Sequence, residues 1–589
     1  MSLNHQKKIL IRGPSGSTRL TVNTFLTVND LYSKLEAELL VSKDSNWSLQ
    51  CDSVELQRSD LLLSKTNLNN GSVVYINISP ELKTKRPSEN LILYSDPCRK
   101  EISDKEVVED PVDVILSNEA GLIKRSYDPL KCKHCLKDKC LHCVDLEPFD
   151  EEYLKEKKIK FMSFQTFTRF LKKRQSNDKC FSLPRWRFTV RSDCSHPSWP
   201  KGLCSRCQPT ALTLNSQPFR HVDYVEFESP QVLDMFLDYW RSSGGRQRFG
   251  FLIGQYEPFY DVPLGVKARV AAIYEPPQES DAFTLQLLDD PQETVLHGLL
   301  SQLGLAVVGC IFTDLENAGG GLVRHKRHKD TFFLSSFECI LAAEFQNKYR
   351  SPCKLAEEGY YGSKFVTVVV SGNQEGQVGL EAYQISNQGM SLVSAGLLRP
   401  TTAFDKGAVQ PVDSSQYVPD VLYSFKDEYG NTVPASADPF FPLDFLLVNV
   451  GAGAPVAQGP VTFASSTPGN GAFPIENREL LGTRLTLAAV KQHVESSATP
   501  LLALSDFHLL LHLATSDVYS LQVTKLACIV REKSAEGARE WISSNDWLNI
   551  LALASVSDEE VNDGFVCKLC TFRNSKKTGD CEVCGIPHH

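Results

Sequence analysis

Three tight clusters of cysteine constrain the folding of this chain more than any other feature of its sequence. The clusters hold eleven of the eighteen cysteines, and the other seven stand singly: Cys51, Cys98, Cys180, Cys310, Cys339, Cys353 and Cys528. In a reducing compartment, clustered cysteines are more often metal ligands than disulfides, and single cysteines are more often small core residues. The clusters therefore predict segments that fold around metal ions.

The last cluster consists of two Cys-x-x-Cys pairs, Cys567 with Cys570 and Cys581 with Cys584, separated by ten residues. Almost no apolar residues lie between the pairs, so this short segment cannot fold on buried area alone. Four thiolates complete a tetrahedral zinc site and leave no open position for catalysis. We therefore expect a closed structural zinc site that holds a small module presenting surface residues.

The two middle clusters share a pattern: Cys132-x-His134-x5-Cys140-x2-Cys143 and Cys194-x-His196-x7-Cys204-x2-Cys207. The second copy has three cysteines, so His196 is its natural fourth ligand, and by analogy His134 is preferred over the additional Cys135 in the first copy. The alternative is that Cys135 binds the metal and His134 is a solvated loop residue. Two closed sites of the Cys3His type result, which makes three structural zinc ions in all.

Length and charge narrow the class of protein. A chain of 589 residues with 42% hydrophobic residues predicts three to five packed domains. A net charge of -9 argues against nucleic acid as the main partner, although three zinc modules and the basic run Lys172-Lys173-Arg174 keep a nucleic-acid-binding protein as one alternative. We interpret that run as a solvated helix face. The absence of an apolar signal core and of a long apolar stretch favours a soluble intracellular protein.

The first 80 residues alternate like a small α/β unit. We expect strands over Lys8–Arg12 and Thr18–Val22, a helix over Val28–Leu40 capped by Asn29 or Asp30, and strands near Trp47–Leu49 and Gly71–Ile76. This is the β-grasp order of ubiquitin. Residues 81–104 are polar and punctuated by proline, as in a linker.

Strands alternate with helices between residues 222 and 395, which predicts a sheet sandwiched by helices. The expected strands are Phe249–Gly254, Val266–Tyr274, Leu305–Thr313 and Lys364–Val370, and the expected helices are Val232–Trp240, Val295–Leu303 and Ser335–Phe345. Farther along, we expect a strand over Leu446–Val450, a mobile loop over residues 451–471, and helices over Leu485–Val494, Phe507–Thr515 and residues 530–555.

Two short segments of this α/β region resemble the MPN domain of JAMM metallo-isopeptidases: Gly309–Asp314 at a strand end and Ser335–Glu338 at a helix start. Active members place His-x-His and Ser-x-x-Asp at these points to bind zinc. Here the histidine positions are Phe312 and Asp314, and the aspartate position is Glu338. Phenylalanine cannot be a ligand, so the resemblance implies an inactive domain kept as a scaffold.

Two histidines lie close to these segments, within the run Arg324-His325-Lys326-Arg327-His328-Lys329. A run of cations repels a divalent metal ion, so we interpret it as an exposed loop and not as a source of replacement ligands.

The terminal cysteine module carries Thr571-Phe572 after its second cysteine and Val583 inside its last Cys-x-x-Cys pair. It resembles the NZF type of zinc finger, in which these positions bind the hydrophobic patch of ubiquitin. An exposed Phe572 has no core to enter on so small a module, which favours an interface. The alternative is that Phe572 only covers the zinc site. Members usually carry tryptophan where this chain has Phe565.

Nearly the whole chain is similar to the nuclear protein localization protein 4 family, on the segments Leu146–Glu151, Cys207–Ala211, Arg220–Asp223, Val262–Gly265, Ala272–Pro277, Ile311–Leu315 and Phe473–Arg478. The β-grasp portion and residues 451–471 are the least similar. The resemblance implies a multidomain α+β protein. Its expected parts are a ubiquitin-like β-grasp domain (1–80), a linker (81–104), a zinc-binding domain with two zinc sites (105–221), an inactive MPN domain (222–395), a C-terminal domain (396–555), an acidic tether (556–563) and an NZF-type zinc finger (564–589).

The same resemblance implies a non-catalytic ubiquitin-binding adaptor. With the ubiquitin fusion degradation 1 protein, it would recruit polyubiquitinated substrates to the valosin-containing protein, an AAA ATPase, for unfolding and proteasomal degradation. The implied location is the cytoplasm and nucleus, with peripheral association with the endoplasmic reticulum through partners and without membrane insertion. The alternative of a zinc deubiquitinase is disfavoured because its metal ligands are missing.

Overall fold

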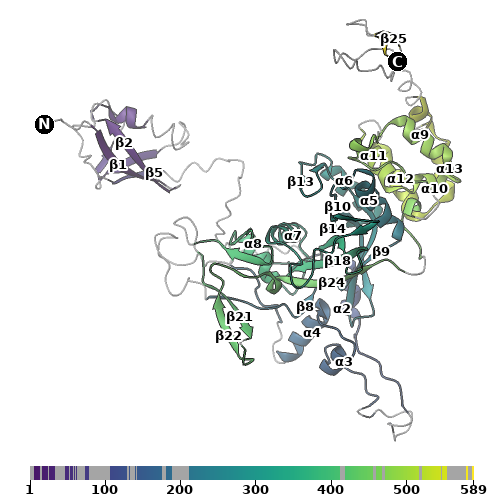
Figure 1. Ribbon diagram of the computed structural model, residues 1–589, viewed down its shortest axis with the longest axis horizontal. Coiled ribbons are helices and arrows are strands. Elements are labelled where there is room, and N and C mark those ends of the chain that lie inside the picture. Colours follow the sequence, from purple (N-terminus) through teal and green to yellow (C-terminus); the bar gives the residue numbers. More distant parts are fainter. Residues whose placement is uncertain are drawn as a thin grey trace. The chain divides into compact units, whose positions relative to one another are not determined.

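The computed structural model describes residues 6–13, 16–23, 26–32, 47–51, 54–56, 59, 61–62, 73–78, 107–128, 132, 140, 142–175, 181–188, 211–411, 418–426, 428–455, 459–466, 471–483, 485–516, 520–545, 547–552, 579–580 and 587–588. These residues fall into two compact units (Figure 1). The first comprises the described residues up to 78, and the second comprises those from 107 onward.

The first unit is a five-stranded sheet with the order β2-β1-β5-β3-β4. Its strands are β1 (Gln6–Gly13), β2 (Gly16–Asn23), β3 (Trp47–Cys51), β4 (Val54–Leu56) and β5 (Val73–Ile78). β1 pairs antiparallel with β2 and parallel with β5, so the first and last strands lie at the centre of the sheet. The expected β-grasp order is confirmed. Leu31, Leu49 and Val74 are fully buried, as a shared core requires.

The helix of this unit is capped differently from our prediction. Helical residues begin at 28, and Thr27 is the capping residue: its Oγ1 accepts a hydrogen bond from the Asp30 amide at 3.2 Å. Asp30 Oδ2 in turn accepts from the Thr27 amide at 2.9 Å. This reciprocal pair is a capping box, in which the acidic residue occupies the third helical position. Asn29 and Asp30 therefore lie inside the first turn, and their assignment as caps was wrong.

The centre of the second unit is a closed barrel with the strand order β10-β11-β9-β24-β18-β17-β14. Its strands are β9 (Tyr224–Phe227), β10 (Phe249–Phe259), β11 (Gly265–Tyr274), β14 (Ala306–Asp314), β17 (Val366–Gly372), β18 (Val378–Ile385) and β24 (Leu447–Gly453). The four predicted strands are all present. The sheet that we predicted to be sandwiched by helices is instead a closed barrel, in which β10 pairs with both β11 and β14.

Strand β24 belongs by sequence to the expected C-terminal domain (396–555), but it is part of the barrel formed mostly by the preceding expected domain (222–395). It pairs with β18 on one side and with β9 on the other. β24 lies at Leu447–Gly453, well beyond residue 395, where we expected the domain to end. The barrel therefore extends past that predicted boundary. No local pattern predicts such a pairing, since the partners of β24 lie far away in sequence.

The barrel has packed side chains on both faces of its wall. All seven residues of β17 are buried. Val366, Val368 and Val370 pack in the interior cluster, whereas Val369 belongs to the cluster under α7 (Ser336–Lys348) and α8 (Asn387–Ser394). Alternate residues of a strand point to opposite faces, so a strand buried on both faces has a continuous apolar sequence.

A helical layer covers the outer face of β10 and β14 (Figure 1). It consists of α6 (Glu293–Leu303), α9 (Leu487–Ser496), α10 (Pro500–Leu504), α11 (Phe507–Thr515), α12 (Ser520–Glu532) and α13 (Ala535–Ile542). Leu299, Leu510 and Leu526 are almost completely buried in one continuous core with Phe249 of the barrel. The C-terminal helices and the barrel therefore share a hydrophobic core.

Described residues of the tract at 451–471, which we predicted to be a mobile loop, pack against the rest of the second unit. Residues 451–453 belong to β24, and Phe463 is completely buried against Phe507, with ring centroids 5.7 Å apart. Thr462 donates from its amide and its hydroxyl to the Glu228 carboxylate at 2.6 and 2.7 Å. One aromatic side chain thus fixes a glycine- and proline-rich segment to the core.

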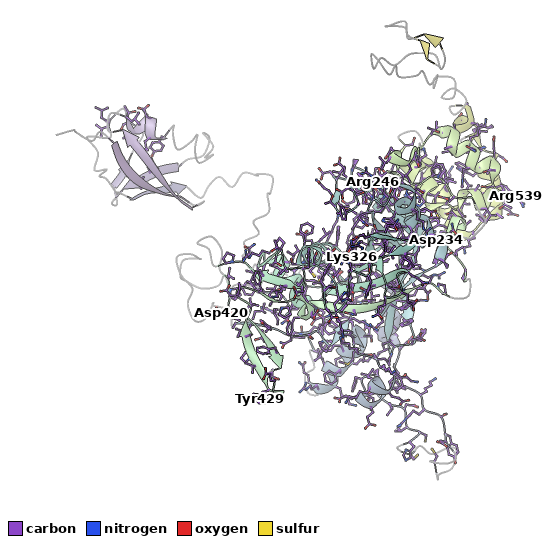
Figure 2. The ribbon with its side chains drawn as sticks, in the orientation of Figure 1. Asp234, Arg246, Lys326, Asp420, Tyr429 and Arg539 are labelled. Atoms are coloured by element: carbon purple, nitrogen blue, oxygen red, sulfur yellow. The ribbon has the colours of Figure 1, made fainter. Side chains whose placement is uncertain are left out.

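Smaller elements surround the barrel. They include α5 (Pro230–Ser242), the pairs β6 (Met162–Ser163) with β8 (Phe219–Arg220), β12 (Gln278–Ser280) with β13 (Leu285–Leu287), and β15 (Asn317–Gly319) with β16 (Leu322–Val323), and the sheet of β19 (Leu398–Arg399), β20 (Lys406–Val409) and β23 (Phe441–Pro442). Another sheet joins β7 (Leu212–Leu214), β21 (Val421–Lys426) and β22 (Thr432–Ser436), with the exposed Tyr429 at the tip of its hairpin (Figure 2). Of the helices described, none is long and apolar enough to cross a membrane.

The region before the barrel contributes α2 (Pro111–Asn118), α3 (Glu151–Glu156) and α4 (Phe164–Arg174). Val112 and Leu116 of α2 pack in the interior cluster of the barrel. The buried Lys364 Nζ bonds to Asp110 at 2.6 Å and also to Asp113, so two carboxylates neutralise it. Lys172, Lys173 and Arg174 at the end of α4 are exposed, as predicted for a solvated helix face.

A buried carboxylate connects the barrel with the segment that leads to the C-terminal helices. Glu275, which is 1% exposed, bonds through Oε2 to Arg248 Nε at 2.7 Å and to Arg478 Nε at 3.0 Å. Asn477 Nδ2 donates to the Glu275 carbonyl at 2.7 Å. Two of the family-like segments, Ala272–Pro277 and Phe473–Arg478, therefore meet at one buried ion network.

Candidate functional site

The first cysteine cluster has the geometry of a metal site. Cys132, Cys140 and Cys143 place their sulfur atoms within 4.8 Å of one another, with Cys140 Sγ 3.7 Å from Cys132 Sγ and 3.8 Å from Cys143 Sγ. Thiolates that bind one tetrahedral zinc ion at about 2.3 Å lie about 3.8 Å apart. A disulfide needs about 2.05 Å. The three sulfurs therefore fit a shared zinc ion and are not disulfide-bonded to one another.

Backbone hydrogen bonds favour the thiolate form of Cys140. The Cys143 amide donates to the Cys140 carbonyl at 3.1 Å, and the Cys140 amide donates to Cys143 Sγ at 3.2 Å, so the Cys-x-x-Cys turn folds back on its own sulfur. Hydrogen bonding from the His142 backbone outweighs partial burial and lowers the pKa of the Cys140 thiol from 9.0 to about 6. A thiol with this pKa is mostly thiolate at neutral pH, which is the form that binds zinc.

The other predicted zinc ligands lie outside the described residues: His134, the alternative Cys135, Cys194, His196, Cys204, Cys207, Cys567, Cys570, Cys581 and Cys584. The predicted ubiquitin contacts Thr571, Phe572 and Val583 lie outside them as well. Within the terminal module, the short strands β25 (Gly579–Asp580) and β26 (Pro587–His588) pair antiparallel. The choice between His134 and Cys135 stays a prediction.

Removing a sulfur from the described cluster is expected to remove one zinc ion. We expect elemental analysis of the purified chain to find one zinc per cysteine cluster, three in all. Cys143→Ser should lose one of these three, because Cys143 belongs to the set of converging sulfurs. Cys528→Ser is the matched control, since Cys528 is a single, partly buried cysteine of α12. Unchanged zinc content in Cys143→Ser would contradict the site.

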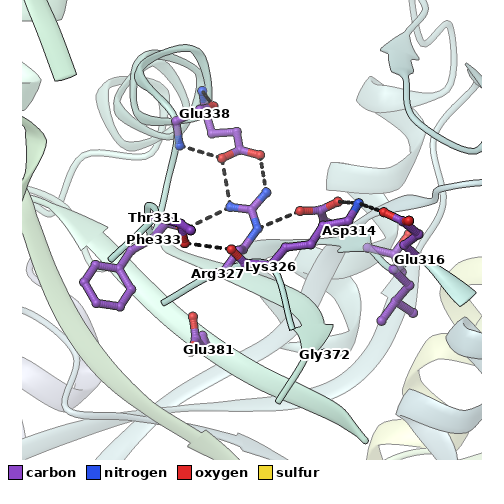
Figure 3. Close-up of polar contacts among 12 residues, drawn as sticks. Asp314, Glu316, Lys326, Arg327, Thr331, Phe333, Glu338, Gly372 and Glu381 are labelled. Carbon is purple, nitrogen blue, oxygen red and sulfur yellow. Dashed lines mark hydrogen bonds and ion pairs between the residues drawn. The ribbon is translucent and has the colours of Figure 1, made fainter. Parts of the chain in front are cut away.

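The three positions to which the MPN resemblance assigned metal ligands surround one arginine side chain, Arg327. Figure 3 shows two of them, Asp314 and Glu338, on either side of its guanidinium. Arg327 Nε bonds to Asp314 Oδ2 at 2.9 Å. Its Nη1 and Nη2 bond to the two carboxylate oxygens of Glu338 at 2.9 and 2.6 Å. The guanidinium carbon lies 5.6 Å from the centroid of the Phe312 ring. A protein cation therefore occupies the space between the two carboxylates.

Secondary structure holds both carboxylates in place. Asp314 ends β14, and Glu338 is the third residue of α7, where its carboxylate accepts from the Ser335 amide at 2.8 Å in a capping box. Lys326 Nζ also reaches Asp314, at 3.3 Å. Both carboxylates are therefore held in place by secondary structure and are already paired with cationic side chains of the same chain.

Our prediction that the run from Arg324 to Lys329 is an exposed loop was wrong at its centre. Arg327 is only 3% exposed, whereas the side chain of Arg324 is 65% exposed. Burial disfavours the charged form, but the Glu338 and Asp314 carboxylates more than compensate and raise the pKa of Arg327. The sequence contained one signal for this buried cation, namely the acidic residues Asp314 and Glu338 at a strand end and a helix start. Two carboxylates that lie close together away from water are stabilised by a cation between them.

The chain matches known proteins over most of its length. The family model described as "NPL4 family" matches residues 248–555, and the model described as "NPL4 family, putative zinc binding region" matches residues 107–244. The second range contains the described cysteine cluster.

Three curated relatives illustrate the similarity. The Nuclear protein localization protein 4 homolog of Rattus norvegicus is 42% identical over 82% of this chain and 83% of its own length. The homolog of Homo sapiens is 38% identical over 98% and 99%, and Nuclear protein localization protein 4 of Saccharomyces cerevisiae is 37% identical over 76% and 80%. Among solved structures, the UBL domain of yeast Ddi1 is 15% identical and matches 13% of this chain and 94% of its own, with a TM-score of 0.12.

Proposed function

The chain belongs to the NPL4 family, and we propose that it is a non-catalytic adaptor that binds ubiquitin and brings polyubiquitinated substrates to an AAA ATPase. The partners we propose are the valosin-containing protein as the ATPase and the ubiquitin fusion degradation 1 protein as a second cofactor. The adaptor would act in the cytoplasm and nucleus, and at the endoplasmic reticulum through its partners, so that extracted substrates reach the proteasome.

The observation that carries this proposal is the position of Arg327. In a metal-dependent isopeptidase a zinc ion would lie among the residues at positions 312, 314 and 338. Here a buried guanidinium bonds both carboxylates, and the remaining position is a phenylalanine. A second cation next to Arg327 would be repelled, and no open coordination position could activate a water molecule. A barrel that resembles an MPN domain and lacks its metal ligands would be suited to presenting a surface.

The small modules supply the binding functions in this proposal. The β-grasp unit is a compact domain of its own and would dock on the ATPase. The two Cys3His sites in residues 105–221 would hold the region that rests on the ATPase ring. The terminal NZF-type finger would bind ubiquitin through Thr571, Phe572 and Val583. The acidic tether at residues 556–563 would let that finger capture chains at a distance.

A deletion experiment separates these functions. We expect a chain lacking residues 1–80 to lose the ATPase in a pull-down while it retains ubiquitin chains, because the two contacts lie on different modules. The matched variant Thr571→Ala with Phe572→Ala should retain the ATPase and bind ubiquitin chains about tenfold more weakly, since buried aromatic contacts dominate such small interfaces. Chain cleavage that a chelator stops and zinc restores would contradict the proposal and favour a deubiquitinase.

A further inference from the structure

A second buried ion pair lies beside the Glu275 network and contains a histidine. His508 of α11 is 6% exposed, and its Nδ1 lies 2.7 Å from Oε2 of Glu476, which is 5% exposed. Oε1 of Glu476 accepts from the Glu275 amide at 3.1 Å. Because Glu476 belongs to the segment at 473–478, the pair connects that segment with α11 and with the end of β11.

The start of α11 holds the same segment through another carboxylate. Asp506, which is completely buried, caps α11 by accepting from the His508 and Leu509 amides at 2.9 and 3.1 Å. Its second oxygen accepts from the Phe473 amide at 2.9 Å. Phe473 and Glu476 are therefore both bonded to the first turn of α11.

Charge balance in this interior depends on the proton of His508. Five other charged side chains are buried here: Glu275, Glu476, Asp506, Arg248 and Arg478. Three carboxylates therefore face two arginines, and a protonated His508 supplies the third positive charge. A neutral His508 would leave one buried negative charge in excess, which is unfavourable away from water.

The surroundings of His508 favour that proton. Burial acts to lower the pKa of His508, but the charge and hydrogen bond of Glu476, followed by the charges of Asp506 and Glu275, raise it above its ordinary 6.5. Burial acts to raise the pKa of Glu476, but the charge and hydrogen bond of His508 lower it below its ordinary 4.5. The contribution of the histidine to stability is therefore complete below pH 6.5 and is lost as the pH rises through its raised pKa.

The neighbouring titratable groups respond differently to pH. His493 and His512 contact the Phe473 ring, with centroids 5.7 and 5.6 Å away. Burial lowers the pKa of His512, so this side chain is already neutral above pH 6.5. The charged residues of α6 and α12, which pack on α11, are exposed or partly exposed: Glu293, His297, Lys525, Arg531 and Glu532.

A small cavity gives His508 contact with water. Its volume is about 20 Å³, and its wall contains His508, Glu275 and Ser465 among mostly apolar side chains of α5, β11 and α11. A cavity of this size has room for a water molecule. Nδ1 of His508 donates to Glu476, whereas Nε2 has no hydrogen-bond partner among the residues that the structure describes. The proton would therefore leave from Nε2 to water.

We propose that His508 is a pH-dependent latch between the segment at 473–478 and α11. With its proton, His508 holds Glu476 and completes the charge balance of the interior. Without it, Glu476 keeps only a hydrogen bond from a neutral imidazole, and the segment separates from α11 more readily. Because α11 shares its core with the barrel, the C-terminal helices are then held less firmly. The latch is independent of the proposed ubiquitin and ATPase contacts.

Hydrogen–deuterium exchange of the full chain, measured by mass spectrometry at about pH 6.5 and about pH 9, tests the latch. After correction for intrinsic rates, we expect residues 473–478 to exchange at least about tenfold faster at the higher pH, because one pKa unit corresponds to a tenfold change. Peptides from β17, whose residues are all buried, should exchange equally at both values. This comparison separates local opening from global unfolding.

Three variants decide whether His508 causes the difference. His508→Gln cannot take up a proton, so residues 473–478 should exchange within about twofold at the two pH values. Glu476→Gln provides a second route if His508→Gln folds poorly, because it removes the carboxylate that raises the pKa of His508, and it should also abolish the difference. His297→Gln is the matched control and should retain the difference, since the His297 side chain is 41% exposed. Equal exchange in the unchanged chain, or an undiminished difference in a folded His508→Gln or Glu476→Gln, would overturn the proposal.

Discussion

Glu275→Gln is expected to lower the free energy of unfolding by about 3–5 kcal/mol, because it leaves Arg248 and Arg478 buried without a counter-charge. Glu275 and Arg248 are each 1% exposed, so water cannot replace the lost carboxylate. The substitution keeps the size of the side chain and thus isolates the loss of charge from the creation of a cavity. A urea titration followed by circular dichroism measures the effect.

Asp238→Asn is the matched control for this prediction. Asp238 also pairs with an arginine, Arg241, at 2.9 Å, but both side chains are at least half exposed. Exposed pairs contribute less than about 1 kcal/mol, so this variant should unfold close to the unchanged chain. If Glu275→Gln were as stable as Asp238→Asn, the two arginines would not depend on Glu275, and the network would not join the barrel to the segment at 473–478.

Arg327→Met is expected to destabilise the barrel by about 3 kcal/mol, since it removes the cation that bonds Asp314 and Glu338. The effect should be smaller than at Glu275 because these two carboxylates are 23% and 21% exposed, and because Lys326 still reaches Asp314. The same urea titration measures the loss. Zinc added to Arg327→Met should not produce ubiquitin-chain cleavage, since Phe312 cannot bind the metal.

Arg324→Met is the matched control for this prediction. It tests whether removing any arginine from the run Arg324–Lys329 lowers the stability of the chain equally. The Arg324 side chain is 65% exposed and pairs with Glu316 at 3.0 Å, so its loss should change stability by less than about 1 kcal/mol. Equal effects of the two variants would show that Arg327 is not an internal counter-ion. Zinc-dependent cleavage by Arg327→Met would show instead that the arginine blocks a competent metal site.

Local elements and short metal motifs were predictable from the sequence. The helix at Phe507–Thr515 and the strand at Val266–Tyr274 have apolar patterns long enough to be recognised, and both are present. The Cys-x-x-Cys turn of Cys140 and Cys143 brings two sulfurs together within four residues, so its chemistry depends on spacing alone. The single cysteines Cys310, Cys339 and Cys353 are buried, as expected of small core residues.

The closure of the barrel was not predictable in this way. Strand β24 enters between β9 and β18, and its apolar pattern would fit an edge strand or a separate domain equally well. Phe463 shows the same limit on a smaller scale: it lies in a segment with Gly459, Pro460 and Ser465, yet its ring is completely buried against Phe507. Strand pairing and ring burial depend on partners that a local window does not contain.

By itself, the sequence determined that this chain contains a β-grasp unit, a cysteine cluster suited to zinc and an α/β region with Phe312 and Asp314 at the end of one strand. Only the tertiary structure decided what lies between the Asp314 and Glu338 carboxylates, because Arg327 is separated from them by 13 and 11 positions in the sequence. The physical reason is that sequence patterns do not reveal the partners of a charged side chain. Its role depends on which groups folding brings within hydrogen-bond distance.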